Sequence, residues 1–321
     1  MGTLCRRLVA LLLGLALIAG AQAGQHCEAR RPTVESMARD LALAASVAQA
    51  LDERAARDGT RVVLIARAGQ NLSEYGLRWS HLGIAYRDSE ALGGRGAWRV
   101  VHKLNQCGTD RSGLYRQGLA EFFGDGLHAH EAGIVVPEPA LQGRLIQQIK
   151  DDRLVARLHE PRYNMLAYPW SGPYQQSNQW AIETLAMLAE PQVGSRLQAR
   201  AWLRAMDYRP QTIYVSTVKR LGARIGTAHI AFDDHPFERR MAGQIDTVTV
   251  ESVFAWMQRA RLGGEMQVLR PGPAGPQPPT VLQTAAVRSR AAARRTSSQA
   301  RACSRLPTCG SASIASVSIA H

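Results

Sequence analysis

Residues 81–105, HLGIAYRDSEALGGRGAWRVVHKLN, decide the fold of this chain. In the first part, Leu82, Ile84 and Tyr86 alternate with smaller residues, which is the two-residue period of a strand. A glycine-rich turn follows, and residues 97–105 form a second run of strand length. The stretch therefore predicts a β-hairpin, and with it an antiparallel sheet.

Helical patterns flank the hairpin along the chain. Residues 33–59 carry leucines and alanines at helical spacing, with Thr33 placed to cap the helix and Gly59 to end it. The same periodicities predict helices at 138–158, at 177–206 with a break near Pro191, and at 249–261, and strands at 61–69 and 227–232. We therefore expect a single domain of the α+β class, in which helices pack on a small antiparallel sheet.

The beginning of the chain has the pattern of an export signal. Arg6 and Arg7 precede an apolar run and then Ala-Gln-Ala at 21–23, which predicts a signal peptide over residues 1–23 with cleavage after Ala23. The run is too short for a comfortable bilayer span, and no later stretch is long and apolar enough for one. We expect an exported, soluble protein of the periplasm or the extracellular space, with no transmembrane segment.

The composition changes again near the end of the chain. We expect residues 24–263 to form the domain, and residues 264–321, rich in proline, alanine, serine and arginine, to be a disordered tail. Of the net charge of +13, seven arginines from Arg270 onward and two in the signal peptide account for nine, which leaves +4 for residues 24–269. Because the tail arginines have no aromatic neighbours to stack on bases, we expect no nucleic-acid partner.

Export gives the cysteines a structural meaning, because disulfides persist in oxidising compartments. Cys5 leaves with the signal peptide, so four cysteines remain in the mature chain. Cys27 precedes the first predicted helix and Cys107 follows a predicted strand. A Cys27–Cys107 bridge would attach the N-terminus to the fold, and two free thiols are the alternative.

Four stretches outside the hairpin carry a family resemblance: YPWSGPYQQSNQWAIETLA, QARAWLRAMDYRPQTIYV, RLGARIGTAHIAFDDHPFERR and IDTVTVESVFAW. They resemble the bacterial family called domain of unknown function 2145, over most of residues 25–262. More distantly, the chain resembles circularly permuted papain-like domains, which include lecithin:retinol acyltransferase-like proteins and permuted NlpC-type peptidases. In that group a histidine opens a strand, the next strand carries a second polar residue, and a cysteine nucleophile starts a later helix. This resemblance implies a permuted papain-like topology.

The distant resemblance implies a candidate catalytic site of Ser177, His81 and His102. His81 opens the first strand of the hairpin, His102 lies on the second, and Ser177 or Asn178 stands where the cysteine would be. A serine at a helix start could be activated by one histidine while the other orients that base. The missing cysteine departs from the group's pattern and speaks against thiol catalysis. The alternatives are an N-cap role for Ser177, backbone contacts for His81 and a solvent-facing position for His102.

Two clusters of histidine and acidic residues suggest metal binding more weakly. His128 and His130, in HAHEAG, would share one face if they lay on a strand, and HIAFDDHPFERR holds His229, His235 and two aspartates. Both stretches look like loops, and Asp-Asp-His-Pro is also the composition of a turn. We therefore assign no metal and no cofactor.

Together these observations predict an exported hydrolase, or an acyl or peptidyl transferase, whose substrate is a peptide or acyl group of the cell envelope. A non-catalytic envelope binding or structural module on the same fold is the alternative, because a serine replaces the expected cysteine. A metal-dependent enzyme that uses the histidine and aspartate clusters is the weakest alternative. Neither enzymatic activity nor an oligomeric state follows from the sequence.

Overall fold

The computed structural model describes residues 32–272, apart from the side chains of residues 224–226. The predicted signal peptide and most of the predicted tail lie outside these residues. The first described helix, α2 (Val34–Asp58), has the predicted ends. The Thr33 side chain accepts a hydrogen bond from the Ser36 N–H, and Gly59 ends the helix with φ of +73°, a conformation that suits glycine.

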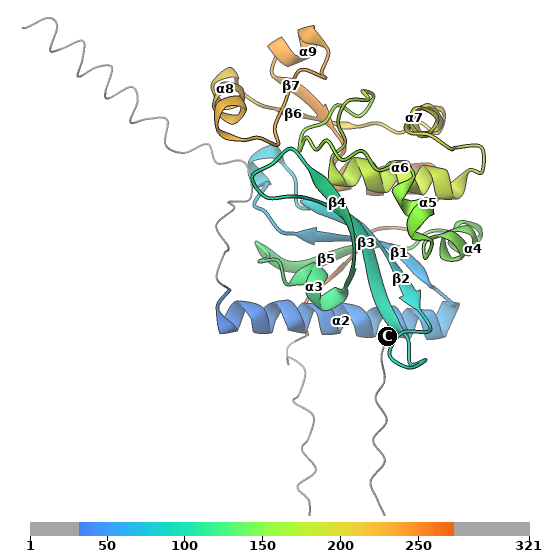
Figure 1. Cartoon of the computed structure of the whole chain (residues 1–321). Coiled ribbons are helices and arrows are strands. Elements are labelled where there is room, and N and C mark those ends of the chain that lie inside the picture. Colours follow the sequence, from blue (N-terminus) through green and yellow to red (C-terminus); the bar gives the residue numbers. More distant parts are fainter. Residues whose placement is uncertain (1–31, 273–321) are drawn as a thin grey trace, which may run out of the picture. The chain divides into compact units, whose positions relative to one another are not determined.

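The centre of the domain is a six-stranded antiparallel sheet with the order β4-β3-β2-β1-β5-β8 (Figure 1). The strands are β1 (Val62–Ala68), β2 (His81–Asp88), β3 (Ala97–Asn105), β4 (Ser112–Gly118), β5 (Ala129–Val135) and β8 (Gln267–Leu269). The predicted hairpin is confirmed as β2 and β3, which pair from Ile84 opposite Val101 to Asp88 opposite Ala97. The α+β class is confirmed as well.

Helices cover both faces of the sheet. Figure 1 shows α2 and the short α3 (Leu119–Phe123) below it and α6 (Ser177–Ala189) above it. The upper layer also includes α4 (Pro139–Gln148), α5 (Asp152–Ala156), α7 (Arg196–Ala205) and α10 (Val250–Arg259). Successive side chains of a strand point to opposite faces of the sheet, so there is an apolar core on each face. On β2, Leu82 and Ile84 pack with α6, while Ala85 packs with α2 and α3.

A smaller unit, which we call the β6–β7 arm (residues 211–247), lies beyond the start of α6. It consists of β6 (Gln211–Tyr214), α8 (Thr217–Gly226), α9 (Phe237–Met241) and β7 (Gln244–Thr247), with β6 and β7 paired antiparallel. The arm has an apolar cluster of its own: Ile213, Val215, Ala223, Ile230, Phe232 and Ile245.

Two predictions of local structure, at 227–232 and at 128–133, are wrong. Residues 227–232 are no strand, because the Asn164 side chain bonds both the N–H and the carbonyl of Ala231. The stretch 128–133 was expected to be a loop, and most of it belongs to β5; its alanines and glycine hide the strand period. The ordered chain also continues past residue 263, because β8 pairs with β5.

Cys107, in the turn after β3, is disulfide-bonded. It is the only cysteine among residues 32–272, and Cys27 is not among the described residues. The pairing with Cys27 therefore stays a prediction. None of the helices within 32–272 is both long and apolar enough to cross a membrane.

Candidate functional site

The two histidines of the hairpin are hydrogen-bonded to each other. His81 Nε2 lies 2.8 Å from His102 Nδ1, and His102 Nε2 lies 2.8 Å from Oε1 of Gln117 on β4. An amide oxygen only accepts hydrogen bonds, so His102 carries its proton on Nε2. Its Nδ1 then accepts the Nε2–H of His81. The chain His81, His102, Gln117 fixes both rings and is the kind of relay that orients a catalytic base.

Both imidazoles are neutral at neutral pH. Burial, reinforced by the nearby guanidinium of Arg67, lowers the pKa of His81 well below its ordinary value and that of His102 to about 4. A general base works best when its pKa lies near the operating pH. These rings are therefore weak proton acceptors, although their shared hydrogen bond is well ordered.

The histidine pair lies on the face of the sheet that α2 and α3 cover. Its rings contact Phe122 of α3, with centroid distances of 6.0 Å from His81 and 5.2 Å from His102. The neighbouring residues in the chain, Leu82 and Lys103, point to the α6 face, as strand alternation requires.

Ser177 is the first residue of α6, on the opposite face from the histidines. The N-cap residue is Gln176, whose side chain makes no capping bond, so the N-cap reading of Ser177 is wrong. Instead, its hydroxyl donates a long hydrogen bond of 3.5 Å to the Tyr163 hydroxyl, and both residues are buried. Within residues 32–272, no hydrogen bond joins Ser177 to His81 or His102. The structure thus brings two of the three predicted site residues together, and their catalytic roles stay predictions.

Asn178 connects the start of α6 to the hairpin. The strands β2 and β3 pair only from Ile84 and Val101 onward, so the Leu82 N–H lies beyond the end of the ladder. Asn178 Oδ1 accepts that N–H at 3.0 Å, and its Nδ2 donates to the Val248 carbonyl. The sequence interpretation considered Asn178 only as a possible substitute for the cysteine. The one signal of its role is its position in the first turn of α6, where a polar side chain can reach the end of a neighbouring strand.

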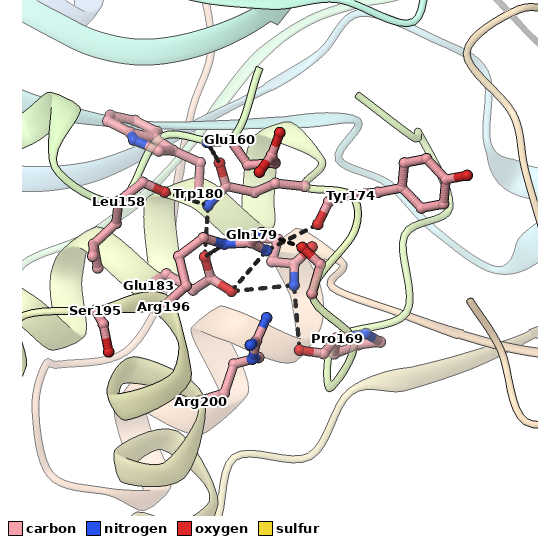
Figure 2. Close-up of polar contacts among 12 residues, drawn as sticks. Leu158, Glu160, Pro169, Tyr174, Gln179, Trp180, Glu183, Ser195, Arg196 and Arg200 are labelled. Carbon is pink, nitrogen blue, oxygen red and sulfur yellow. Dashed lines mark hydrogen bonds and ion pairs between the residues drawn. The ribbon is translucent and has the colours of Figure 1, made fainter. Parts of the chain in front are cut away.

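A buried ion pair secures the loop that leads into α6 (Figure 2). Glu183 is fully buried, and its carboxylate accepts from Arg196 Nε at 2.7 Å, from Gln175 Nε2 at 2.6 Å and from Gln179 Nε2 at 3.2 Å. The same donors also bond carbonyl oxygens of the loop: those of Leu158, Pro169, Gly172 and Tyr174. A buried carboxylate with this many donors fixes structure, because each lone pair is satisfied within the protein.

Lys103 extends this network from the sheet. Its Nζ donates to the Glu160 carbonyl at 2.7 Å and to Gln175 Oε1 at 2.8 Å. Burial, with the charge of Arg196 as a second cause, lowers the pKa of Lys103 to about 7. Sequence reasoning missed this residue, because a lysine in an alternating strand reads as solvent-facing.

The β6–β7 arm contains a hollow of about 380 Å³, which we call the α8–α9 hollow. Its lining residues come from α8, α9 and the loops beside them: Tyr174, Thr217, Arg220, Leu221, Ile230, Ala231, Phe232, Asp233, Arg240 and Met241. A second hollow, of about 410 Å³, lies between β5 and the segment 68–78. The predicted site residues Ser177, His81 and His102 line neither of them.

Two of the histidines that suggested a metal, His130 and His235, have other partners, whereas the ring nitrogens of the buried His229 have no hydrogen-bond partner among residues 32–272. His130 Nε2 lies 3.2 Å from Asp40, and the ring nitrogens of His235 contact the Asp234 carboxylate and the Asp246 carbonyl. Among residues 32–272, no group of three or more histidine, cysteine, aspartate or glutamate side chains is arranged to hold a metal ion. The Asp-Asp-His-Pro segment thus forms a hydrogen-bonded turn.

Comparison with known proteins gives one match. The model of the family described as an uncharacterized protein conserved in bacteria (DUF2145) matches residues 54–257. The chain belongs to this family. The matched region covers the hairpin, α6 and the arm, and it ends before β8. No curated protein and no solved structure matches the chain.

Proposed function

We propose that this chain is an exported, non-catalytic binding module of the bacterial cell envelope, on a permuted papain-like fold. The observation that carries the proposal is the position of Ser177, whose hydroxyl is bonded to Tyr163 while the histidine pair lies on the other face of the sheet. A serine nucleophile needs a base within hydrogen-bond reach to remove its proton. Export is supported by the signal pattern of residues 1–23.

The state of the histidines supports the same conclusion. A thiolate-imidazole pair can form when the thiol is acidic and the imidazole basic, whereas a serine hydroxyl depends on the base alone. Here the pKa values of His81 and His102 are both lowered by burial. The polar groups around α6 are used for packing, since the Glu183 network secures the loop over its start.

Binding is assigned to the α8–α9 hollow, because it combines open volume, apolar walls and charged groups. Small-ligand sites are commonly concave, mostly apolar and of a few hundred Å³, with a few placed polar groups. The α8–α9 hollow meets these criteria with a volume of about 380 Å³. It also lies apart from the histidine pair, so binding there needs no catalytic residue.

Labelling with a fluorophosphonate probe tests the absence of catalysis. The mature chain is treated with the probe and digested, and the peptide that contains Ser177 is examined by mass spectrometry. We expect no more adduct on Ser177 than on heat-denatured chain, because no histidine of residues 32–272 is hydrogen-bonded to the serine. Time-dependent labelling of Ser177 in the folded chain alone would refute the proposal. Co-sedimentation of the mature chain with isolated cell envelopes tests binding, and recovery only in the supernatant would count against it.

A hydrolase is the second candidate, and one observation favours it. Asn178 bonds the Leu82 N–H at the end of the β2–β3 ladder, so the start of α6 and the strand start that carries His81 are adjacent. If the site is catalytic, Ser177→Cys should turn over an activated ester faster than the wild type, because a thiolate suits an imidazole partner better. Equal rates for Ser177→Cys and Ser177→Ala would remove this candidate.

A further inference from the structure

Two arginines, Arg220 and Arg240, line the α8–α9 hollow. Arg220 is 8% exposed, and its nitrogens donate to the Val215 carbonyl at 2.6 Å and the Thr217 hydroxyl at 3.2 Å. Arg240 Nη1 donates to the Phe232 carbonyl at 3.3 Å. Neither arginine forms an ion pair with any acidic side chain of residues 32–272. Within this part of the chain, both cations are held by neutral acceptors.

This arrangement favours an anionic ligand. A buried charge costs free energy unless it is paired, and guanidinium groups bind carboxylates with paired, charge-assisted hydrogen bonds. One acidic side chain, Asp233, also lines the α8–α9 hollow, and its carboxylate accepts from the Tyr174 hydroxyl at 3.1 Å. The hollow therefore carries a net charge of about +1, which suits a single carboxylate and leaves one acceptor for a ligand N–H.

The walls beside the arginines are apolar. Ile230 and Phe232 are buried at the base of the hollow, while Leu221 and Met241 are 61% and 59% exposed. Leucine and methionine side chains this exposed, on two helices that face one hollow, offer apolar surface that a ligand could cover. The ligand should therefore place an apolar group next to its carboxylate.

We propose that the α8–α9 hollow binds a monocarboxylate with an adjacent apolar side chain, the chemistry of an apolar amino acid or of a peptide that ends in one. This inference rests on the proposed function as a binding module. Arg240 and Arg220 bind the carboxylate, the apolar group packs against Leu221 and Met241, and Asp233 accepts an N–H of the ligand.

Titration calorimetry on the mature chain with three probes tests the proposal. N-acetyl-L-leucine should bind saturably at one site, and N-acetyl-L-leucinamide, which lacks the carboxylate, should bind at least about tenfold more weakly, as expected for a lost charged hydrogen bond. L-leucine distinguishes the two sources. If L-leucine binds more tightly than N-acetyl-L-leucine, and Asp233→Asn removes this difference, the ligand is a free amino acid. If L-leucine binds equally or more weakly, the ligand is the C-terminus of a peptide.

A matched pair of variants locates the site. Arg240→Gln should weaken N-acetyl-L-leucine about tenfold, because it removes one carboxylate partner while leaving the buried Arg220 in place. Arg209→Gln removes the same charge from an exposed residue outside the hollow and should leave the affinity unchanged. Circular dichroism checks that both variants are folded. The inference would be overturned if N-acetyl-L-leucine did not bind the wild type or if the amide bound with equal affinity. It would also be overturned if the two variants changed the affinity equally. Catalysis that depends on Ser177 would refute the proposed function as a non-catalytic binding module, but it would not change these affinities.

Discussion

His81, His102 and Ser177 show how strand alternation decides which side chains can meet. Leu82 and Ile84 form the apolar face of β2, so His81 must point to the other face. The sequence shows this alternation but does not show which face a distant helix covers. Because α6 packs on the Leu82 face, Ser177 and His81 lie on opposite sides of the sheet, although the residues that follow them, Asn178 and Leu82, are hydrogen-bonded. The residue types of the site could be predicted from the sequence. The face of the sheet on which each residue lies could not.

The histidine pair should make the protein sensitive to mild acid. In the folded state the pKa of His102 is lowered to about 4 from an ordinary 6.5, so the unfolded state takes up the proton first as the pH falls. The stability contributed by the neutral ring is present above pH 6.5 and is lost as the pH falls toward 4. For a shift of this size the loss is about 3 kcal/mol. Urea unfolding at pH 7 and pH 4.5 should show a smaller loss for His102→Gln than for the wild type.

His128→Gln is the control for this measurement. This variant removes an exposed histidine in place of a buried one. If His102→Gln lost as much stability between the two pH values as the wild type and His128→Gln, the burial argument for His102 would be wrong.

At the scale of elements, two segments of the chain have a structural role that differs from the one their local sequence pattern indicates. The helix α6 begins with polar residues that locally indicate a cap or a nucleophile. In the structure, Asn178 joins the helix to β2, and Gln179 joins it to the loop 158–176. The segment 227–232 has a strand-like composition, and its backbone is bonded instead to Asn164. Both contacts bridge residues far apart in the sequence, which local periodicity cannot reveal.

Arg196 should be essential for the stability of α6 and its loop. Arg196→Met leaves the Glu183 carboxylate buried without its cation, which should reduce the free energy of unfolding by about 3 to 5 kcal/mol. Adding Glu183→Gln should restore part of that loss, because the remaining side chain is neutral. Arg200→Met is the matched control, since Arg200 lies on the same helix and donates to the neutral Ser171 carbonyl. Chemical denaturation compares the four chains, and equal losses in the two single variants would contradict the role of the ion pair.

The hairpin requires glycine at position 83. A Cβ on Gly83 would lie 2.5 Å from Val100 Cγ1, closer than side-chain atoms pack, so Gly83→Ala should cost about 1 to 3 kcal/mol by overpacking. Gly143→Ala provides the comparison, because Gly143 lies in α4 with open space where the alanine methyl group would be, and alanine favours the helix. Thermal unfolding should shift downward for the first variant and slightly upward for the second. A Gly83→Ala chain as stable as wild type would show that the strands are not this close.

At the scale of the whole molecule, the first helix, the hairpin and the α+β class followed from periodicity and capping residues. The strands β4 and β5 and the elements of the β6–β7 arm did not, because their side chains are small or mixed and their burial depends on tertiary partners. The strand β8 is only three residues long and gains its structure by pairing with β5. No local pattern would have indicated it.

The mature chain should start at Gly24 and contain a Cys27–Cys107 disulfide. The signal pattern predicts the cleavage, and Cys107 is disulfide-bonded. In the chain-entropy model, closing a loop of this length stabilises by about 4 kcal/mol. Non-reducing peptide mapping of the exported protein should recover the two cysteines in one linked peptide. A Cys107 linked to Cys303 or Cys309, or a chain that still begins at Met1, would contradict this prediction.

The most direct test of the central claim, that the fold acts without catalysis, is hydrolysis of p-nitrophenyl acetate by the mature chain and by Ser177→Ala. Because Ser177 is bonded to Tyr163 and the histidines lie on the opposite face, both chains should give the same initial rate at every pH from 6 to 9. Loss of one long hydrogen bond should reduce the stability of the variant by less than about 1 kcal/mol, so it remains folded in the assay. Saturable turnover by the wild type that is abolished in Ser177→Ala would contradict the account.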